Sequence, residues 1–234
     1  MARLKLSILV PVYNEFNSIE VVVERIRKQL LNNLGFNEIE VIIVDDGSSD
    51  GTREWLRGLN KRYRVIFHKQ NQGLTEAMIS GFEAATGDVI LIQHADLEYH
   101  PKDWPKLLKP IIDGKADMVM GSRYLKKSGK QHFSIRYQLG GQGLTKLFNV
   151  IYQTKLTDIF TAHRAFTKEV KNNFRVHGKG FAFETELTAQ TVKTNFRIKE
   201  VPILYKARTF QEGKKLHWHA AIDVIKAMIR NAVG

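Results

Sequence analysis

The sequence predicts an α/β fold in which helices flank a mostly parallel sheet. Three short runs of Val, Ile and Leu carry this prediction, because each ends abruptly in polar residues; they are residues 6–12, 39–44 and 88–93. Apolar runs of this length, bounded by glycine and acidic residues, are typical of buried parallel strands. The 234 residues are enough for one large domain with a substantial core.

Strands and helices alternate over the first half of the chain. The expected strands are residues 6–12, 39–44, 63–68, 88–93 and 117–121, and the expected helices are residues 17–31, 51–60, 73–85 and 102–113. The first helix has apolar residues at helical spacing along one face: Ile19, Val22, Val23, Ile26 and Leu30. This alternation favours parallel pairing through right-handed crossovers.

The pattern changes after Arg123. Residues 124–134 are polar and basic and are expected to form a mobile loop. The elements expected after them are helices over 136–152 and 181–193, a strand over 197–204 and a loop over 206–215. We see no boundary of a second domain, so residues 1–123 and 124–215 are expected to be two halves of one domain that share a sheet edge.

Residues 216–234 are predicted to add an amphipathic C-terminal helix. Its apolar residues recur at helical spacing: Trp218, Ala221, Ile222, Ile225, Met228, Ile229, Ala232 and Val233. Two interpretations stay open. The helix can pack on its own domain, or it can lie in a membrane interface with this side in the lipid.

Polar residues follow three of the predicted strands. His94, Asp96 and Glu98 come after residues 88–93 at every second position, so in an extended chain they would share one face. Ligands of open α/β sheets bind beyond the carboxyl ends of the strands. Imidazole and carboxylate donors at that edge suit a divalent ion that carries a phosphate. The alternative is a loop whose acidic residues cap the next helix.

Composition limits the partners of the chain. It has 36 Lys and Arg against 24 Asp and Glu, a net charge of +12 that favours anionic partners. No nucleic-acid motif with interleaved aromatic residues is present, so nucleic acid is not expected. The absence of cysteine excludes disulfides and thiolate metal sites and fits a reducing compartment. No signal peptide and no membrane-spanning run of about 18 apolar residues is recognisable.

A nucleotide site at this edge would have to use side chains and a metal. No G-x-G-x-x-G follows the first strand, and no G-x-x-x-x-G-K-[ST] occurs anywhere in the chain. Short motifs of another kind occur in order: Pro11-Val12-Tyr13-Asn14-Glu15, Val44-Asp45-Asp46-Gly47-Ser48, Ala95-Asp96, Gly121-Ser122-Arg123-Tyr124, Asp158 with Arg164-Ala165-Phe166, and Val201-Pro202-Ile203 followed by Arg208. The ordered set resembles family 2 glycosyltransferases of the GT-A fold, within which it is similar to dolichyl-phosphate mannosyltransferase and related polyprenyl-phosphate glycosyltransferases.

The resemblance implies a GT-A (Rossmann-like) fold and a reaction. A sugar would move from a nucleoside diphosphate sugar, GDP-mannose or a UDP-hexose, to a polyprenyl phosphate with inversion. Residues 1–123 would form the half for the nucleotide sugar, and residues 124–215 the half for the acceptor. A divalent metal, Mn²⁺ or Mg²⁺, would offset the charge of the leaving diphosphate. The enzyme would work in the cytoplasm, peripherally at the cytoplasmic face of a membrane.

The same resemblance assigns residues to roles. The nucleoside would be bound by Pro11, Tyr13, Glu15, Asp45, Asp46 and Ala95, and the metal by Asp96 with Glu98 and His94. The acceptor phosphate is already nucleophilic and needs guanidinium clamps more than a general base. Those clamps would be Arg123, Arg136 and Arg208, with Lys214 or Lys215 assisting, so the catalytic set is Asp96, Arg123, Arg136 and Arg208.

This chain departs from the family pattern at several positions. His94 stands where the family has Asp, and imidazole is a better ligand for manganese than for magnesium. Gly140 replaces a Ser four residues after Arg136, and the stretches Thr161-Ala162-His163-Arg164 and Gln211-Glu212-Gly213-Lys214-Lys215 also differ from the usual motifs.

Two other functions therefore remain as alternatives. Glu184 or Glu186 could contact sugar hydroxyls or act as the base for a saccharide hydroxyl acceptor in polysaccharide assembly, although both also suit a helix start, where acidic residues favour the helix dipole. A nucleotide-sugar binding protein that lost catalysis through the change at His94 is the second alternative.

Overall fold

The structure is a computed structural model that describes residues 4–30, 34–59, 61–125, 135–178, 182–208 and 220–233. The expected mobile loop falls largely on residues 126–134, and Lys214, Lys215 and Trp218 also lie outside the described residues.

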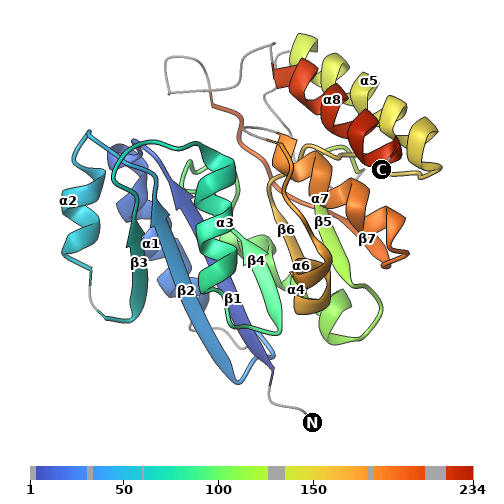
Figure 1. The fold of residues 1–234 in the computed structure, drawn as a ribbon. Helices are drawn as coiled ribbons and strands as arrows, with labels where there is room; N and C mark the ends of the chain where they lie inside the picture. Colours follow the sequence, from blue (N-terminus) through green and yellow to red (C-terminus); the bar gives the residue numbers. More distant parts are fainter. Residues whose placement is uncertain are drawn as a thin grey trace.

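A seven-stranded sheet forms the centre of the molecule (Figure 1). Its order is β3-β2-β1-β4-β6-β5-β7, with bounds Lys5–Val12 (β1), Glu38–Asp45 (β2), Tyr63–Phe67 (β3), Val89–Ile92 (β4), Met118–Ser122 (β5), Arg164–Thr167 (β6) and Ile198–Pro202 (β7). All neighbouring pairs are parallel except those that β6 makes with β4 and β5. The predicted α/β class with a mostly parallel sheet is confirmed.

Helices cover both faces of the sheet. Their bounds are Phe16–Leu30 (α1), Thr52–Arg57 (α2), Leu74–Ala84 (α3), Trp104–Ile112 (α4), Ile135–Tyr152 (α5), Lys168–Asn173 (α6), Ala182–Lys193 (α7) and Ala220–Val233 (α8), and a short 3₁₀ turn, η1 (Pro101–Asp103), leads into α4. Figure 1 shows α3 and α6 in front of the sheet and α1 and α4 behind it. None of the described helices is both long and apolar enough to cross a membrane.

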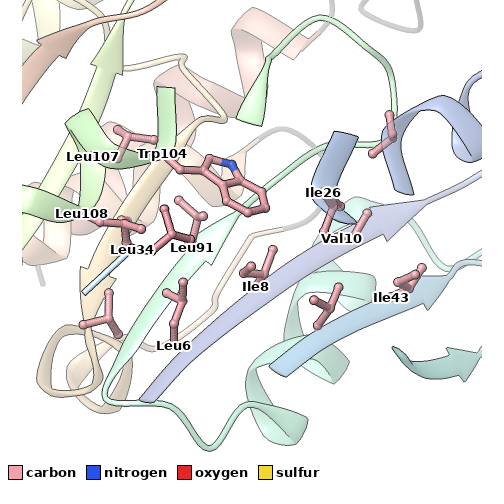
Figure 2. Packing of buried hydrophobic residues seen from close by; sticks show 14 of the residues in the cluster. Leu6, Ile8, Val10, Ile26, Leu34, Ile43, Leu91, Trp104, Leu107 and Leu108 are labelled. Carbon is pink, nitrogen blue, oxygen red and sulfur yellow. The ribbon is translucent and has the colours of Figure 1, made fainter. Parts of the chain in front are cut away.

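The strands are apolar on both faces because each face has its own core. In β4, Val89 and Leu91 point into the core on the α1 and α4 side, whereas Ile90 and Ile92 point into the core on the α3 and α7 side. Figure 2 shows the first of these cores, in which Trp104 packs near Leu91. Successive residues of a strand alternate between faces, so uninterrupted apolar runs are what a covered parallel sheet requires.

The sequence analysis missed β6 and the short helix α6 that follows it in the chain. β6 has only four residues and begins with the fully buried Arg164, so it lacks the length and the apolar pattern of the other strands. It is held from both sides, because Phe166 pairs with Ile90 of β4 and with Met118 of β5. This antiparallel insertion separates β4 from β5, which a simple series of parallel crossovers would have placed together.

The C-terminal helix α8 packs on its own domain. Val224 and Met228 are buried in a third core with Phe148 of α5 and Ala189 of α7. Figure 1 shows α8 beside α5 at one end of the molecule. Its opposite side is not covered by the described residues, because Ile222 remains 44% and Ile229 54% exposed.

Candidate active site

The polar ends of three strands meet at one edge of the sheet, as the sequence predicted. The last residues of β1 and β2 are partners, since Val12 pairs with Asp45 in parallel register. The last residue of β4 is also next to β1, since Ile92 pairs with Leu9. The loops after these strands therefore start side by side.

Hydrogen bonds tie these loops to one another. The backbone N–H of Asn14 donates to Ser48 Oγ at 2.9 Å, and the N–H of Ser49 donates back to Asn14 Oδ1 at 2.9 Å. Ser18 Oγ lies 2.8 Å from the carbonyl oxygen of Ala95, so the predicted nucleotide residue Ala95 is fixed to the start of α1 through its backbone. The edge is pre-organised by the chain itself.

Three carboxylates and one arginine gather at this edge. We call Glu15, Asp96 and Glu98 the carboxylate cluster. Arg208 reaches it with both prongs of its guanidinium, Nη1 to Glu15 Oε2 at 2.9 Å and Nη2 to Glu15 Oε1 at 2.8 Å. Arg208 Nη2 also lies 3.7 Å from Asp96 Oδ2, and the backbone N–H of Arg208 donates to Glu98 Oε1 at 2.9 Å. Residues far apart in sequence thus form one charged site.

Burial makes the cluster costly to charge. It raises the pKa of the Asp96 carboxyl, and the nearby Arg208 opposes this rise only in part. Burial also raises the pKa of Glu98, and the neighbouring Asp96 charge adds to it. Carboxylates in such a setting favour a cation close by.

The turn after β4 differs from the extended chain that the sequence analysis assumed. β4 ends at Ile92, Leu97 has a positive φ of 61°, and the N–H of Glu98 donates to Asp96 Oδ1 at 3.1 Å. The chain from His94 to Glu98 is therefore not extended, so the alternation that would place these side chains on one face does not apply. Within the described residues, no group of three or more His, Asp or Glu side chains is arranged to hold a metal ion by itself.

His94 is kept neutral at this edge. Burial lowers its pKa, and the charge of Glu184 opposes that only in part. Its ring meets the ring of Tyr99 edge-on, with centroids 6.4 Å apart. A neutral imidazole keeps a lone pair for a metal or a phosphate-bound proton, so the predicted ligand role of His94 stays a prediction.

The predicted nucleoside residues lie around the same edge. Pro11 is buried in β1, and Tyr13 follows it partly exposed. Asp45 is fully buried and is engaged by Arg53 Nε at 2.7 Å and by the N–H of Ser48 at 3.2 Å.

Asp46 organises the loop that precedes α3. Its Oδ1 accepts from the N–H of Gln72 at 2.9 Å and its Oδ2 from the N–H of Gly73 at 2.7 Å. His68 Nδ1 lies 2.8 Å from Oδ1, and His68 Nε2 lies 2.9 Å from Ser80 Oγ. Asp46 therefore fixes backbone N–H groups at the edge, in addition to any contact with a nucleoside.

A second guanidinium lies on the other side of the edge. Arg123 is paired with the fully buried Asp158 through Nε at 2.7 Å and Nη2 at 2.8 Å. The Arg123 guanidinium carbon also lies 4.9 Å from the ring centroid of Tyr205. The hydroxyl of Tyr205 donates to Glu98 Oε2 at 2.8 Å. Tyr205 thus joins Arg123 to the carboxylate cluster.

Comparison with known families decides the class of this site. The sequence profile of Glycosyl transferase family 2 matches residues 7–177. The chain belongs to this family. The match begins within β1, runs past α6 and includes Glu15, Asp96 and Glu98 of the carboxylate cluster, so the resemblance deduced from the motifs is confirmed.

Two relatives of this glycosyltransferase are named as mannosyltransferases. A dolichol-phosphate mannosyltransferase of Pyrococcus furiosus is 31% identical over 217 residues, which are 90% of this chain and 59% of that protein. An undecaprenyl-phosphate mannosyltransferase of Micrococcus luteus is 28% identical over 215 residues, 88% of this chain and 85% of that protein. The chain thus spans well under two thirds of the length of the Pyrococcus protein.

Solved structures agree with the fold. Glucosyl-3-phosphoglycerate synthase from Mycobacterium tuberculosis, in complex with Mn²⁺, uridine diphosphate and phosphoglyceric acid, superposes with a TM-score of 0.75 at 20% identity and covers 98% of this chain and 78% of that one. The same enzyme was also solved with Mg²⁺ and uridine diphosphate, with a TM-score of 0.72 at 20% identity, covering 98% of this chain and 80% of that one. At such identities the likeness concerns the fold.

Two of the predicted phosphate-binding groups of the glycosyltransferase cannot be placed. Arg136 lies in the first turn of α5, but its side chain is outside the described residues, as is the whole of Lys214. The structure does bring Arg123 and Arg208 to one region, because Tyr205 contacts the former and Glu98 contacts both Tyr205 and the latter.

Glu184 and Glu186 have different surroundings. Glu186 is fully buried, accepts from the N–H groups of His177 at 3.1 Å and Gly178 at 3.0 Å, and is paired with Arg230 of α8. It anchors α8 to α7. Glu184 is also buried, and its charge raises the pKa of His94 against the larger lowering by burial.

Tyr205 is the site residue that sequence reasoning missed. Its ring and its hydroxyl serve two different partners, Arg123 and Glu98. The signal was present in the motif that runs from Val201 to Arg208, because Tyr205 stands between the two ends of that motif. The pairing of Arg208 with Glu15 carried no such signal, since 193 residues separate them.

Proposed function

We propose that this family 2 glycosyltransferase transfers a hexose from a nucleoside diphosphate sugar to a polyprenyl phosphate, with inversion and with the help of a divalent metal. The observation that carries the proposal is the carboxylate cluster set beside two arginines, Arg123 and Arg208, at the carboxyl edge of the sheet. A site for two phosphate-bearing substrates requires both kinds of charge.

The residues present suit a divalent metal. Mg²⁺ and Mn²⁺ take carboxylate oxygens, and Mg²⁺ is usually held by one or two carboxylates together with substrate phosphates, without a complete protein cage. The side chains of Asp96 and Glu98, with His94, offer such a partial set, in keeping with the lack of a complete metal cluster among the described residues. The metal, when bound, would stabilise the charge that develops on the leaving diphosphate.

Side chains of the protein would position the loops of the site and the acceptor phosphate. Asp46 would hold the N–H groups of Gln72 and Gly73 in place at the edge, and the loop of Asn14 would be fixed by Ser48. Arg123 and Arg208 would orient the acceptor phosphate for in-line attack on the anomeric carbon. A phosphate oxygen needs no deprotonation to attack, so no general base is required.

A lipid acceptor is supported by the names of the two mannosyltransferases and by the surface of α5 and α8. We call the exposed apolar residues of these two helices the apolar surface: Leu139, Leu147, Val150, Ile222 and Ile229. Large apolar side chains on two adjacent helices are suited to a membrane interface, and the net charge of +12 favours anionic headgroups. Attachment to the cytoplasmic face stays a prediction.

The decisive experiment incubates the protein with Mn²⁺, labelled GDP and UDP sugars, and either a short polyprenyl phosphate or a saccharide. Label on the lipid is the expected result. Label on the saccharide alone would favour a hydroxyl acceptor, and binding without turnover would favour a nucleotide-sugar binding protein.

The hydroxyl-acceptor alternative has one observation in its favour. Glu184 is a carboxylate near His94 at the sheet edge, where a base for a sugar hydroxyl would be useful. Glu184→Gln separates the two functions. For phosphate transfer we expect at most about a tenfold loss in kcat, whereas loss of a general base costs about 100-fold or more.

The membrane role is tested with liposomes. Ile222→Glu with Ile229→Glu should release the protein from anionic liposomes, because both side chains are on the exposed side of α8. Val21→Glu with Ile112→Glu is the matched control, since it places the same two charges at exposed apolar positions on α1 and α4. Equal sedimentation of both double variants with liposomes would rule out the apolar surface as the attachment site.

A further inference from the structure

Arg208 occupies the carboxylate groups that the proposed function assigns to the donor and its metal. Its guanidinium is bidentate on Glu15 at 2.8 and 2.9 Å and lies 3.7 Å from Asp96. The contact is well shielded, because the Arg208 side chain is 19% exposed and the Glu15 side chain 9%. A two-pronged contact of this kind is strong and specific in geometry.

The carboxylate cluster needs a positive charge when no substrate is present. Burial and the mutual repulsion of Asp96 and Glu98 both act against ionisation of these groups. Arg208 supplies the charge from two directions, since its guanidinium contacts Glu15 and its backbone N–H donates to Glu98. A divalent ion bound to Asp96 would also supply positive charge to the cluster.

We infer that Arg208 is the resident cation of the carboxylate cluster in the free enzyme, and that the donor with its metal replaces it there. Released from Glu15, the guanidinium becomes available to a phosphate dianion or monoanion of the acceptor. This inference rests on the proposed function, because it assigns the donor to the cluster and the acceptor phosphate to Arg208. It adds that the two binding events are linked through one side chain.

Charge determines whether the donor and the acceptor help or hinder each other's binding. Metal and Arg208 compete for Asp96, so each weakens the hold of the other on the cluster. Acceptor phosphate competes with Glu15 for the Arg208 guanidinium, so each substrate favours the state that the other requires. Binding coupling of this kind is reciprocal: donor raises acceptor affinity by the same factor as acceptor raises donor affinity.

The first test measures Mn²⁺ binding without any nucleotide, by the electron paramagnetic resonance signal of the free ion. Arg208→Gln removes the resident cation and should tighten Mn²⁺ binding about tenfold. Arg208→Lys keeps a charge but loses the two-pronged contact, so its affinity for Mn²⁺ should fall between the two. Arg197→Gln is the matched control, because it removes an arginine that pairs with Asp117 at the surface.

The second test measures binding of a soluble short-chain polyprenyl monophosphate. In the wild type, GDP or UDP with Mn²⁺ should raise its affinity about five- to tenfold. Glu15→Gln frees the guanidinium without removing it and should give part of this gain before any donor is added. Thermal denaturation checks that each variant is folded, and Arg208→Lys remains the test if Arg208→Gln does not fold.

The outcomes separate this inference from the proposed function. Equal Mn²⁺ affinities in wild type, Arg208→Gln and Arg208→Lys would overturn the role of Arg208 as resident cation, whatever the enzyme transfers. If Arg208→Gln binds Mn²⁺ more tightly but the wild-type enzyme forms no glycosylated polyprenyl phosphate, the role of Arg208 as resident cation stands and the proposed acceptor is overturned. Acceptor affinity that does not respond to donor would overturn the linkage.

Discussion

Two buried carboxylates are held in different ways: Asp46 lies in residues 1–123, here called the donor half after its proposed role, and Asp158 lies in residues 124–215, the acceptor half. In the donor half, Asp46 accepts hydrogen bonds from the backbone N–H groups of Gln72 and Gly73. In the acceptor half, Asp158 and Arg164 instead have charged or carbonyl partners. Asp158 is paired with Arg123, and the fully buried Arg164 donates to the carbonyl oxygens of Thr161 and Glu184.

This difference has consequences for stability and for function. A carboxylate held by several N–H groups keeps its other partners when one neighbour changes, so the loop that Asp46 holds should tolerate single substitutions. A buried ion pair leaves an uncompensated charge when one partner is removed. The Arg123–Asp158 pair should therefore respond strongly to single substitutions.

The largest effect is expected from breaking the Arg123–Asp158 pair. Asp158→Ala leaves the guanidinium buried without its carboxylate and should lower the free energy of unfolding by about 3–5 kcal/mol. Urea denaturation followed by circular dichroism measures this loss. Asp117→Ala, which breaks the pair with the exposed Arg197, should cost far less. Similar losses in the two variants would remove the contrast between buried and exposed pairs.

The next effect concerns pH and the buried His163. Burial lowers the pKa of His163 to about 4, against 6.5 in an unfolded chain. Between these values the unfolded state binds a proton that the folded state does not, so stability falls as the pH drops from 6.5 towards 4. His163→Phe keeps an aromatic ring against Tyr99 and should remove this part of the pH dependence.

The size of the pH effect follows from the same shift. Because only the unfolded state binds the His163 proton between pH 6.5 and pH 4, the free energy of unfolding should fall by about 3 kcal/mol over that range. The measurement is the difference in unfolding free energy between wild type and His163→Phe at pH 7 and at pH 4.5. A difference that does not change with pH would mean that His163 is not held neutral by the fold.

In the donor half, a substitution at Asp96 should affect nucleotide binding without affecting stability. Asp96→Asn should weaken Mn²⁺-dependent binding of GDP or UDP by about 100-fold, or about 2.8 kcal/mol. Because burial raises the pKa of Asp96, removing its charge should not lower the unfolding free energy. Isothermal titration with and without Mn²⁺ measures the first effect. Unchanged nucleotide affinity with Mn²⁺ would contradict the metal assignment.

The sequence reveals the donor half of the fold more completely than the acceptor half. Residues 5–122 alternate between strands and helices, and each strand is read from a continuous apolar run such as β2. β6 cannot be read in this way, because its four residues owe their place to pairing with β4 on one side and β5 on the other. Long-range pairing of this kind leaves no local periodicity.

The contacts of the site also differ in how far the sequence predicts them. The convergence of the loops after β1, β2 and β4 follows from parallel topology, so Glu15, Asp45 and Asp96 could be brought together from sequence. The turn at Leu97 could not be predicted, because a positive φ at a leucine has no sequence signal. The contact of Arg208 with Glu15 depends on the whole fold.

The smallest expected effect tests the junction between the two halves. Tyr205→Phe keeps the ring beside Arg123 and removes only the hydroxyl that donates to Glu98 at 2.8 Å. A hydrogen bond to a carboxylate contributes about 1.5 kcal/mol, so the unfolding free energy should fall by about that amount.

Tyr205→Leu removes the ring as well and separates the two contacts of this residue. Tyr205→Phe removes the hydroxyl contact with Glu98, so we expect it to weaken Mn²⁺ binding. It retains the ring contact with Arg123, so the affinity for a polyprenyl monophosphate should stay unchanged. Tyr205→Leu should weaken both, because the Arg123 guanidinium then loses the aromatic face that supports it. Titrations of Mn²⁺ and of the lipid phosphate with each variant measure the two effects separately. If Tyr205→Phe weakened lipid phosphate binding as much as Tyr205→Leu, the hydroxyl and not the ring would support the acceptor half, and the two halves would be joined through Glu98 alone.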